Sequence, residues 1–130
     1  MAEKEILNLD DVKLLVDTFY GKIRNDELLG PIFNERIQDR WQMHLEKMYS
    51  FWQTLLLEEH TYHGRPFPPH MNLPVAHEHF AHWLKLFTQT INELFTGAKA
   101  DEAKWRAENI AKMFETKLNY FRSHQGLSIL

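Results

Sequence analysis

The sequence predicts a single all-α domain, and three observations lead to this fold class. Apolar residues recur at three- and four-residue spacing along most of the 130 residues, which is the period of an amphipathic helix. Five glycines and five prolines are too few for a β-sandwich or barrel, which turns about every ten residues. The chain is 44% hydrophobic, so it can bury a core, and its length fits one domain over residues 1–130.

The first helix is predicted from apolar residues at mixed three- and four-residue spacing between positions 14 and 23. Asp10 or Asp11 can cap its beginning, because a carboxylate accepts hydrogen bonds from the unpaired backbone N–H groups of the first turn. We expect this helix to stop near Asn25. The residues from there to Gly30-Pro31 are expected to form a turn, because glycine and proline are typical of turns.

A second, longer helix is expected to begin after Asp39, the next residue that can cap a helix, and to run to about Glu59. The segment that follows, residues 61–74, holds four of the five prolines. Proline lacks a backbone donor and clashes inside helices, so no long helix can cross this segment. So long an irregular segment in a small helical domain is unusual unless it has a function. The core behind it must be filled by side chains or by a ligand.

Two further helices complete the predicted fold. Helical spacing resumes after Pro74 and ends at Thr96-Gly97, and Asp101 is the expected cap of the last helix. The expected apolar face of that last helix consists of Trp105, Ile110, Met113, Phe114, Leu118 and Phe121. The chain is therefore expected to form four principal helices, with a core over about residues 10–122 and frayed ends.

The composition excludes several classes of protein. The chain has no cysteine, which excludes disulfides, thiolate catalysis, iron–sulfur clusters and cysteine-ligated zinc. A net charge of −3 argues against a nucleic-acid binder, which normally carries a basic face. No signal peptide or membrane-spanning stretch is recognisable, so a cytoplasmic protein without a membrane partner is expected. Phosphate-binding loops and familiar catalytic motifs are absent, and the sequence does not decide whether the protein is an enzyme.

Four side chains are candidates for a functional site. His70 lies at the centre of the proline-rich segment, where two preceding prolines stiffen the backbone. Tyr20 follows Phe19 on the inner side of the first helix. His44 lies at the edge of the apolar stripe of the second helix, and Trp83 lies among apolar residues of the third helix. Each has a plainer interpretation as a solvated or core side chain. Taken singly, these residues do not establish a site.

Together these residues form a pattern that resembles the truncated haemoglobins. The pattern is carried by Phe19-Tyr20, Leu29-Gly30-Pro31-Ile32-Phe33-Asn34, Trp41 with His44, Phe51-Trp52, Tyr62-x-Gly64-x-Pro66-x-x-x-His70-x-x-Leu73-Pro74 and Trp83-Leu84-x-Leu86-Phe87. The block over residues 62–74 is the most specific part and points to the third group of the family. The glycine pairs typical of the other groups are absent, which supports that assignment. The resemblance covers about residues 10–122.

The resemblance implies a two-over-two helical sandwich around haem b, the iron protoporphyrin IX. The expected haem-binding residues are His70, Phe33, Met48, Trp52, Arg65 and Tyr62. Of these, His70 is the implied proximal ligand of the iron, with its second ring nitrogen oriented by a carbonyl. Arg65 either reaches a haem propionate or is solvated. A flat apolar disc would fill the gap left by the proline-rich segment.

The resemblance also implies the function. Tyr20, His44 and Trp83 match the family's distal positions, where a hydroxyl, an imidazole and an indole N–H can each donate a hydrogen bond to a ligand. The implied protein is a monomeric globin that binds O₂, CO or NO at a five-coordinate haem iron. Three donors would hold O₂ tightly, which suits redox chemistry on O₂, NO or peroxide, with a reductase as partner. His44 could also swing outward and open a path for the ligand.

Two other classes of function stay open. His77, His79 and His82 cluster at the start of a helix, with His60 and His63 before it, so a zinc site is conceivable. Zinc prefers three or four tetrahedral ligands, however, and no carboxylate is clearly placed to complete the set. The other alternative is a helical interaction module without a cofactor. A Soret absorption band in the purified protein would distinguish haem from both.

Overall fold

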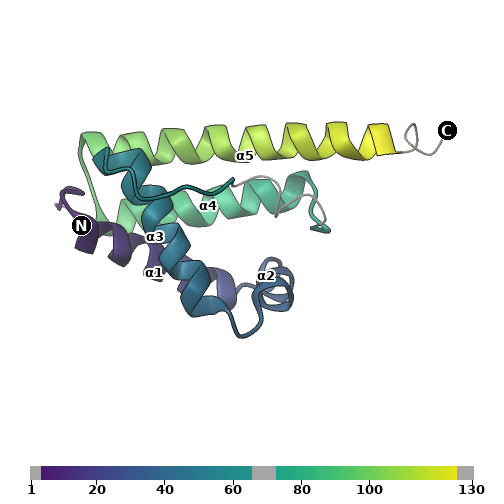
Figure 1. Ribbon diagram of the computed structural model, residues 1–130, viewed down its shortest axis with the longest axis horizontal. Helices are drawn as coiled ribbons and strands as arrows, with labels where there is room; N and C mark the ends of the chain where they lie inside the picture. Colours follow the sequence, from purple (N-terminus) through teal and green to yellow (C-terminus); the bar gives the residue numbers. More distant parts are fainter. Residues whose placement is uncertain (1–3, 66–72, 126–130) are drawn as a thin grey trace.

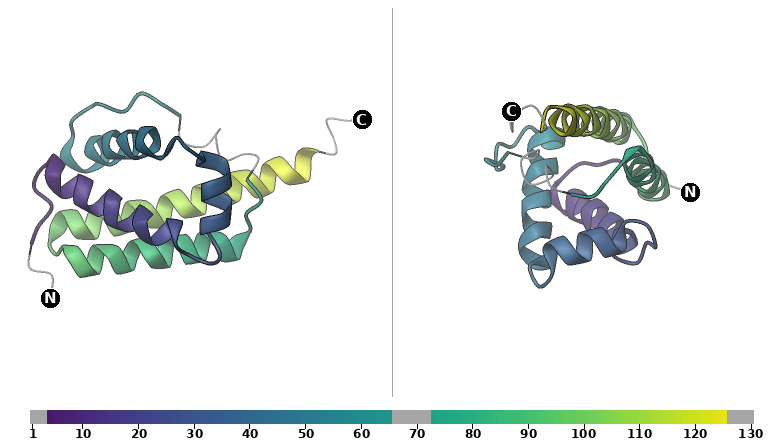
Figure 2. Two further views of the ribbon diagram at one scale, coloured as in Figure 1. Left: turned by 90° about the horizontal axis from the view of Figure 1, so that it is seen from below. Right: turned by 90° about the vertical axis from the view of Figure 1, so that its right-hand side faces the viewer.

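The computed structural model describes residues 4–65 and 73–125, and in these residues it contains only helices and irregular segments. The helices are α1 (Leu9–Arg24), α2 (Gly30–Ile37), α3 (Trp41–Leu57), α4 (His77–Leu94) and α5 (Ala98–Gln125). The two longest, α4 and α5, lie side by side, and α1 packs against both α3 and α4 (Figures 1 and 2). This arrangement confirms the predicted all-α class. None of the described helices is long and apolar enough to span a bilayer.

The helix α2 was not predicted from the sequence. Gly30-Pro31 was expected to end a turn, whereas it begins this helix. Proline is well tolerated in the first turn of a helix, because the N–H that it lacks would be unpaired there. Gly30 is required by close packing, since a Cβ at this position would lie 2.9 Å from the carbonyl oxygen of Arg24. The chain therefore turns tightly between α1 and α2.

The cap of α1 is Asn8, and not Asp10 or Asp11 as predicted. The Asn8 side chain accepts a hydrogen bond from the backbone N–H of Asp11 at 3.1 Å. In return, the Asp11 carboxylate accepts hydrogen bonds from the backbone N–H groups of Leu7 and Asn8 and forms an ion pair with Lys4 at 2.7 Å. The Asp11 side chain is only 2% exposed, so the carboxylate half of this capping box is buried.

Two other predicted caps are wrong. Arg40, and not Asp39, is the N-cap residue of α3, and its side chain makes no capping hydrogen bond. The last helix begins at Ala98, directly after Gly97 with its φ of +95°, so Asp101 lies within its first turn. A carboxylate in the first turn interacts favourably with the positive end of the helix dipole, so Asp101 stabilises the beginning of the helix without capping it.

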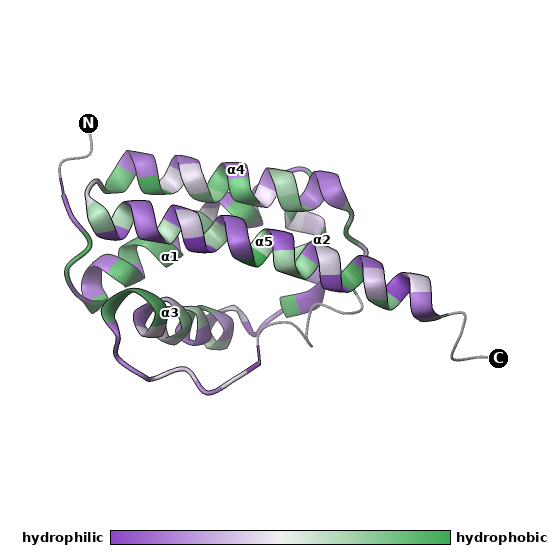
Figure 3. Cartoon of the chain, turned by 90° about the horizontal axis from the view of Figure 1, so that it is seen from above, coloured by the Kyte–Doolittle hydropathy of each residue, from purple (hydrophilic) through white to green (hydrophobic). Residues whose placement is uncertain are grey.

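The face of α5 that packs against α4 contains an alanine stripe that the sequence analysis did not predict. The buried face of α5 consists of Ala100, Ala103, Ala107, Ala111, Phe114 and Leu118. Trp105 and Met113, which were expected on this face, are 60% and 41% exposed. Hydrophilic and hydrophobic residues alternate around α5 (Figure 3). Alanine is a weak hydrophobic signal, but its small side chain lets another helix approach closely.

We predict that Asp11→Asn destabilises the protein by about 1–3 kcal/mol at neutral pH, because it breaks the ion pair with Lys4 and weakens the cap. Burial raises the pKa of Asp11, but Lys4 and the two backbone donors outweigh it and lower that pKa overall. A lowered pKa stabilises the native state above the ordinary aspartate range, and this stability is lost as the pH falls through the native pKa. Urea unfolding at about pH 7 and about pH 3 measures both effects.

The control is Asp10→Asn, because Asp10 lies in the same turn and is exposed. An equal loss of stability in both variants would contradict the role assigned to the buried carboxylate.

Candidate functional site

A cavity of about 700 Å³ lies between the helices and reaches the segment that follows α3. Side chains from all five helices line it, and most of them are aromatic or aliphatic. This volume falls within the range of about 300–1,000 Å³ that is typical of small-molecule and cofactor sites. The cavity is therefore large enough for a ligand, and most of its lining is apolar.

The structure brings together every described residue that the sequence analysis assigned to the site. The residues that line the cavity include Tyr20, Phe33, His44, Met48, Trp52, Tyr62, Arg65 and Trp83. They come from α1, α2, α3, α4 and the segment after α3, so only the folded chain places them together. His70, the predicted iron ligand, lies outside the described residues.

Tyr20 presents a buried hydroxyl to this cavity. The residue is 6% exposed, and burial raises the pKa of its hydroxyl well above that of an exposed phenol, so the group stays protonated. Its ring packs edge-on against Trp41 and His44, with ring centroids 6.0 and 5.0 Å away. Tyr20 is among the residues that line the cavity. A ligand in the cavity is the partner that this donor can serve.

His44 completes an aromatic corner with Tyr20 and Trp41. Its ring is perpendicular to the Tyr20 ring, and its centroid lies 5.7 Å from that of Trp41. The Nε2 atom is buried although the residue as a whole is half-buried. The imidazole is therefore packed at the cavity wall in this structure.

Trp83 belongs to an aromatic stack with Phe87 and Trp52. Phe87 lies between the two indoles, with centroids 4.9 Å from Trp52 and 5.7 Å from Trp83 and nearly parallel rings. Phe19 packs edge-on against Trp83 at 5.6 Å. Both tryptophans thus line the cavity while sharing one buried neighbour, and their orientations depend on each other.

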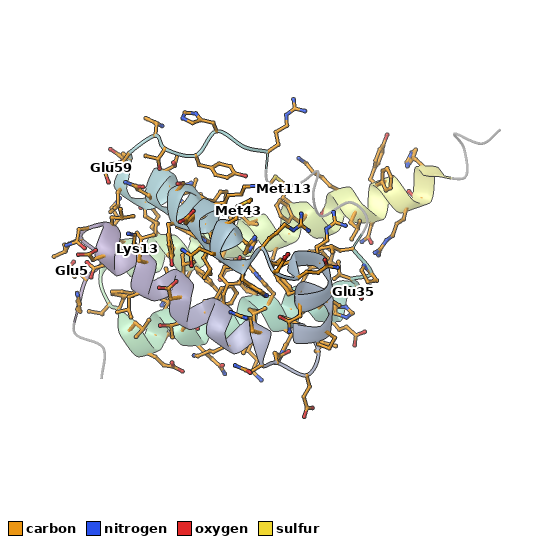
Figure 4. The ribbon with its side chains drawn as sticks, turned by 60° about the horizontal axis from the view of Figure 1, so that its bottom comes forward. Glu5, Lys13, Glu35, Met43, Glu59 and Met113 are labelled. Carbon is orange, nitrogen blue, oxygen red and sulfur yellow. The ribbon has the colours of Figure 1, made fainter. Side chains whose placement is uncertain are left out.

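The segment after α3 is held by one hydroxyl. Thr54 Oγ1 has one proton to donate, and its nearest acceptor is the carbonyl oxygen of Ser50 at 2.8 Å. It accepts hydrogen bonds from the backbone N–H groups of Thr61 and Tyr62 at 3.1 and 3.0 Å. The segment leaves α3 near Glu59 (Figure 4). Thr54 therefore fixes the backbone just before the cavity-lining side chain of Tyr62.

The ring of Tyr62 is placed by its neighbours on both sides. Phe51 packs edge-on against it, with centroids 5.2 Å apart. Gly64 lies so close that a Cβ there would be 2.7 Å from the Tyr62 hydroxyl oxygen. This close approach explains why glycine stands in the sequence pattern at this position.

The cavity also has residues that the sequence analysis did not assign to it. They include Leu29, Met43, Lys47, Phe51, Val75, Phe80, Ile110, Ala111 and Phe114. Most of them are ordinary apolar positions of amphipathic helices, and nothing in their spacing distinguishes a cavity wall from a packed core. Lys47 and Arg65 are exposed and bring positive charge to the cavity.

The histidines considered for zinc do not converge. His77 pairs with Glu115 at 2.9 Å, His82 pairs with Asp26 at 2.7 Å, and the Nδ1 of His79 accepts the backbone N–H of Ala76. Across the part of the chain that the structure describes, no group of three or more potential metal ligands forms. The geometry therefore gives the zinc alternative no support in this region.

Comparison with known proteins shows close relatives among the globins. Residues 6–118 match the family of bacterial-like globins. The chain is 36% identical over 124 residues to the group 3 truncated hemoglobin ctb of Campylobacter jejuni, an alignment that covers 92% of this chain and 98% of that protein. It is also similar to the crystal structure of a group III truncated hemoglobin from Campylobacter jejuni, with a TM-score of 0.82 and 36% identity over 91% of this chain and 95% of the other.

We predict that Thr54→Val loosens the segment after α3, because it leaves the backbone N–H groups of Thr61 and Tyr62 without their acceptor. A lost hydrogen bond of about 1.4 kcal/mol corresponds to a tenfold change, so amide exchange at Thr61 and Tyr62 should become about tenfold faster. Hydrogen exchange followed by NMR measures it. Thr54→Ser keeps the hydroxyl and should retain protection, and equal exchange in the valine and serine variants would count against this role.

Proposed function

The chain belongs to the bacterial-like globin family, as a group III truncated haemoglobin, and from this premise we propose that its cavity takes up haem b and exposes one face of it to a set of distal donors. The coarse function, a haem-binding globin, follows from membership of the family. The proposal adds the residues that hold the group, the ligands and the chemistry.

The walls of the cavity suit a flat apolar macrocycle with a charged edge. Phe33, Met48 and Trp52 offer the apolar and aromatic surface, and Tyr62 closes the side toward the segment after α3. The exposed cations Arg65 and Lys47 can neutralise propionates. His70 is the proposed proximal ligand, on its place in the family pattern. When bound, haem supplies an iron centre that binds diatomic ligands and exchanges electrons.

One observation carries the distal part of the proposal: the Tyr20 side chain is buried and lines the cavity, and burial raises the pKa of its hydroxyl, so that the group stays protonated. Desolvation makes such a donor strong toward a polarised ligand, because water does not compete for it. His44 and Trp83 line the same cavity and add an imidazole and an indole N–H. Tyr20 is therefore the principal donor, and the other two assist it.

This donor set favours retention of O₂ over rapid release. A protein of this kind is suited to chemistry on O₂, NO or peroxide, for which a reductase would supply electrons. We include the monomeric state, a cytoplasmic location and an outward swing of His44 during ligand access in this proposal. His44 suits such a motion because the residue as a whole is only half-buried.

We predict that His70→Ala abolishes stable haem retention, because no other residue in the family pattern replaces the lost iron–nitrogen bond. The Soret absorption and the haem-to-protein ratio after gel filtration measure this. His60→Ala is the matched control, since His60 precedes the same segment but does not line the cavity. A His70→Ala protein that keeps haem in full stoichiometry with an unchanged Soret band would show that another residue is the ligand.

We predict that Tyr20→Phe speeds O₂ release by about ten- to a hundredfold, because a hydrogen bond to a charged or strongly polarised acceptor is worth about 1.5–3 kcal/mol. The substitution removes one oxygen and preserves the packing of the ring. Stopped-flow measurement of O₂ dissociation tests it. If Trp83→Phe accelerates release while Tyr20→Phe does not, the principal donor is Trp83.

A further inference from the structure

A hydrogen bond between a histidine and a carboxylate joins α4 to the turn between α1 and α2. The Nε2 atom of His82 lies 2.7 Å from the Oδ1 atom of Asp26, and the two side chains are only 29% and 16% exposed. The two residues are 56 positions apart in the sequence. Partial burial distinguishes this pair from ordinary surface ion pairs, which contribute little because water and salt screen them.

Asp26 also organises the turn in which it lies. Its Oδ2 atom accepts hydrogen bonds from the backbone N–H groups of Leu28 and Leu29 at 3.0 and 2.9 Å, and its carbonyl oxygen accepts the N–H of Gly30 at 2.9 Å. Burial raises the pKa of Asp26, but the hydrogen bonds from His82 and from these amides lower it overall. The turn leads into α2, so Asp26 positions the cavity-lining side chains of Leu29 and Phe33.

His82 directly precedes Trp83 on α4. Trp83 lines the cavity, whereas neither His82 nor Asp26 does. The bond between them therefore links two walls of the cavity from outside: the wall that carries Trp83, and the wall formed by Leu29 and Phe33. Phe19 on α1 packs edge-on against Trp83, and Phe87, on the same helix as Trp83, stacks on it.

We propose that His82 is a positioning residue: its bond to Asp26 fixes α4 relative to the α1–α2 turn, and so sets where Trp83 stands in the distal part of the cavity. This inference rests on the proposed function, because it concerns the donor geometry of the same site. His82 acts through Trp83 and through the turn, and it makes no contact with a ligand. A purely structural ion pair would change stability and leave Trp83 in place.

The test compares three variants of the full chain. His82→Leu removes the donor, and His82→Gln retains an N–H that can reach Asp26. The control is His77→Leu, which breaks the pair between His77 and Glu115. Neither residue of that pair lines the cavity. The first measurement is the ¹⁵N–¹H resonance of the Trp83 indole, assigned by its loss in Trp83→Phe, before and after haem is added. The second is the O₂ dissociation rate.

We expect His82→Leu to shift or broaden the Trp83 resonance and to change the O₂ dissociation rate by about threefold to tenfold, which is less than direct loss of a donor. His82→Gln should restore both, and His77→Leu should leave both unchanged. An unaltered Trp83 resonance in His82→Leu, or an unaltered dissociation rate, overturns the inference, as does an equal effect of His77→Leu. If the unmodified chain takes up no haem, the proposed function fails, and the resonance in the haem-free chain still decides whether His82 positions Trp83.

Discussion

A chain of 130 residues that contains a cavity of about 700 Å³ must hold the walls of that cavity apart. Small domains are stabilised by apolar side chains that pack closely in a core. This chain has such a core beside the cavity, and local contacts behind the cavity walls add to it. Phe87 separates and orients two tryptophans, the Thr54 hydroxyl gathers one segment, and Asp26 gathers another. Each of these contacts lies behind one wall, so the side chains on the cavity face of that wall can contact a ligand.

An apolar cavity also restricts which polar groups can line it. A cavity lined with apolar groups makes any polar group inside it costly unless that group meets a partner. Tyr20 lines the cavity, and burial raises the pKa of its hydroxyl, so this group stays neutral there. A ligand that accepts its hydrogen bond makes the arrangement favourable, which links the packing of α1 to the function.

The sequence predicted the all-α class, four of the five helices and a set of cavity residues, because these depend on helical period and on a specific family pattern. It missed α2 because Gly30-Pro31 suits the end of a turn and the start of a helix equally well. It placed Trp105 on the buried face of α5 because hydrophobicity alone does not show that alanines form the contact. It identified His82 only as one of a group of histidines. Its partner Asp26 is distant in the sequence, and no spacing rule connects the two.

The alanine stripe of α5 ends at Ala111, a buried residue that belongs both to the helix contact and to the cavity wall. A larger side chain at this position would narrow the cavity, while the three proposed donors are on other helices. A substitution of Ala111 therefore changes the size of ligand that the cavity can bind and leaves its polar contacts unchanged.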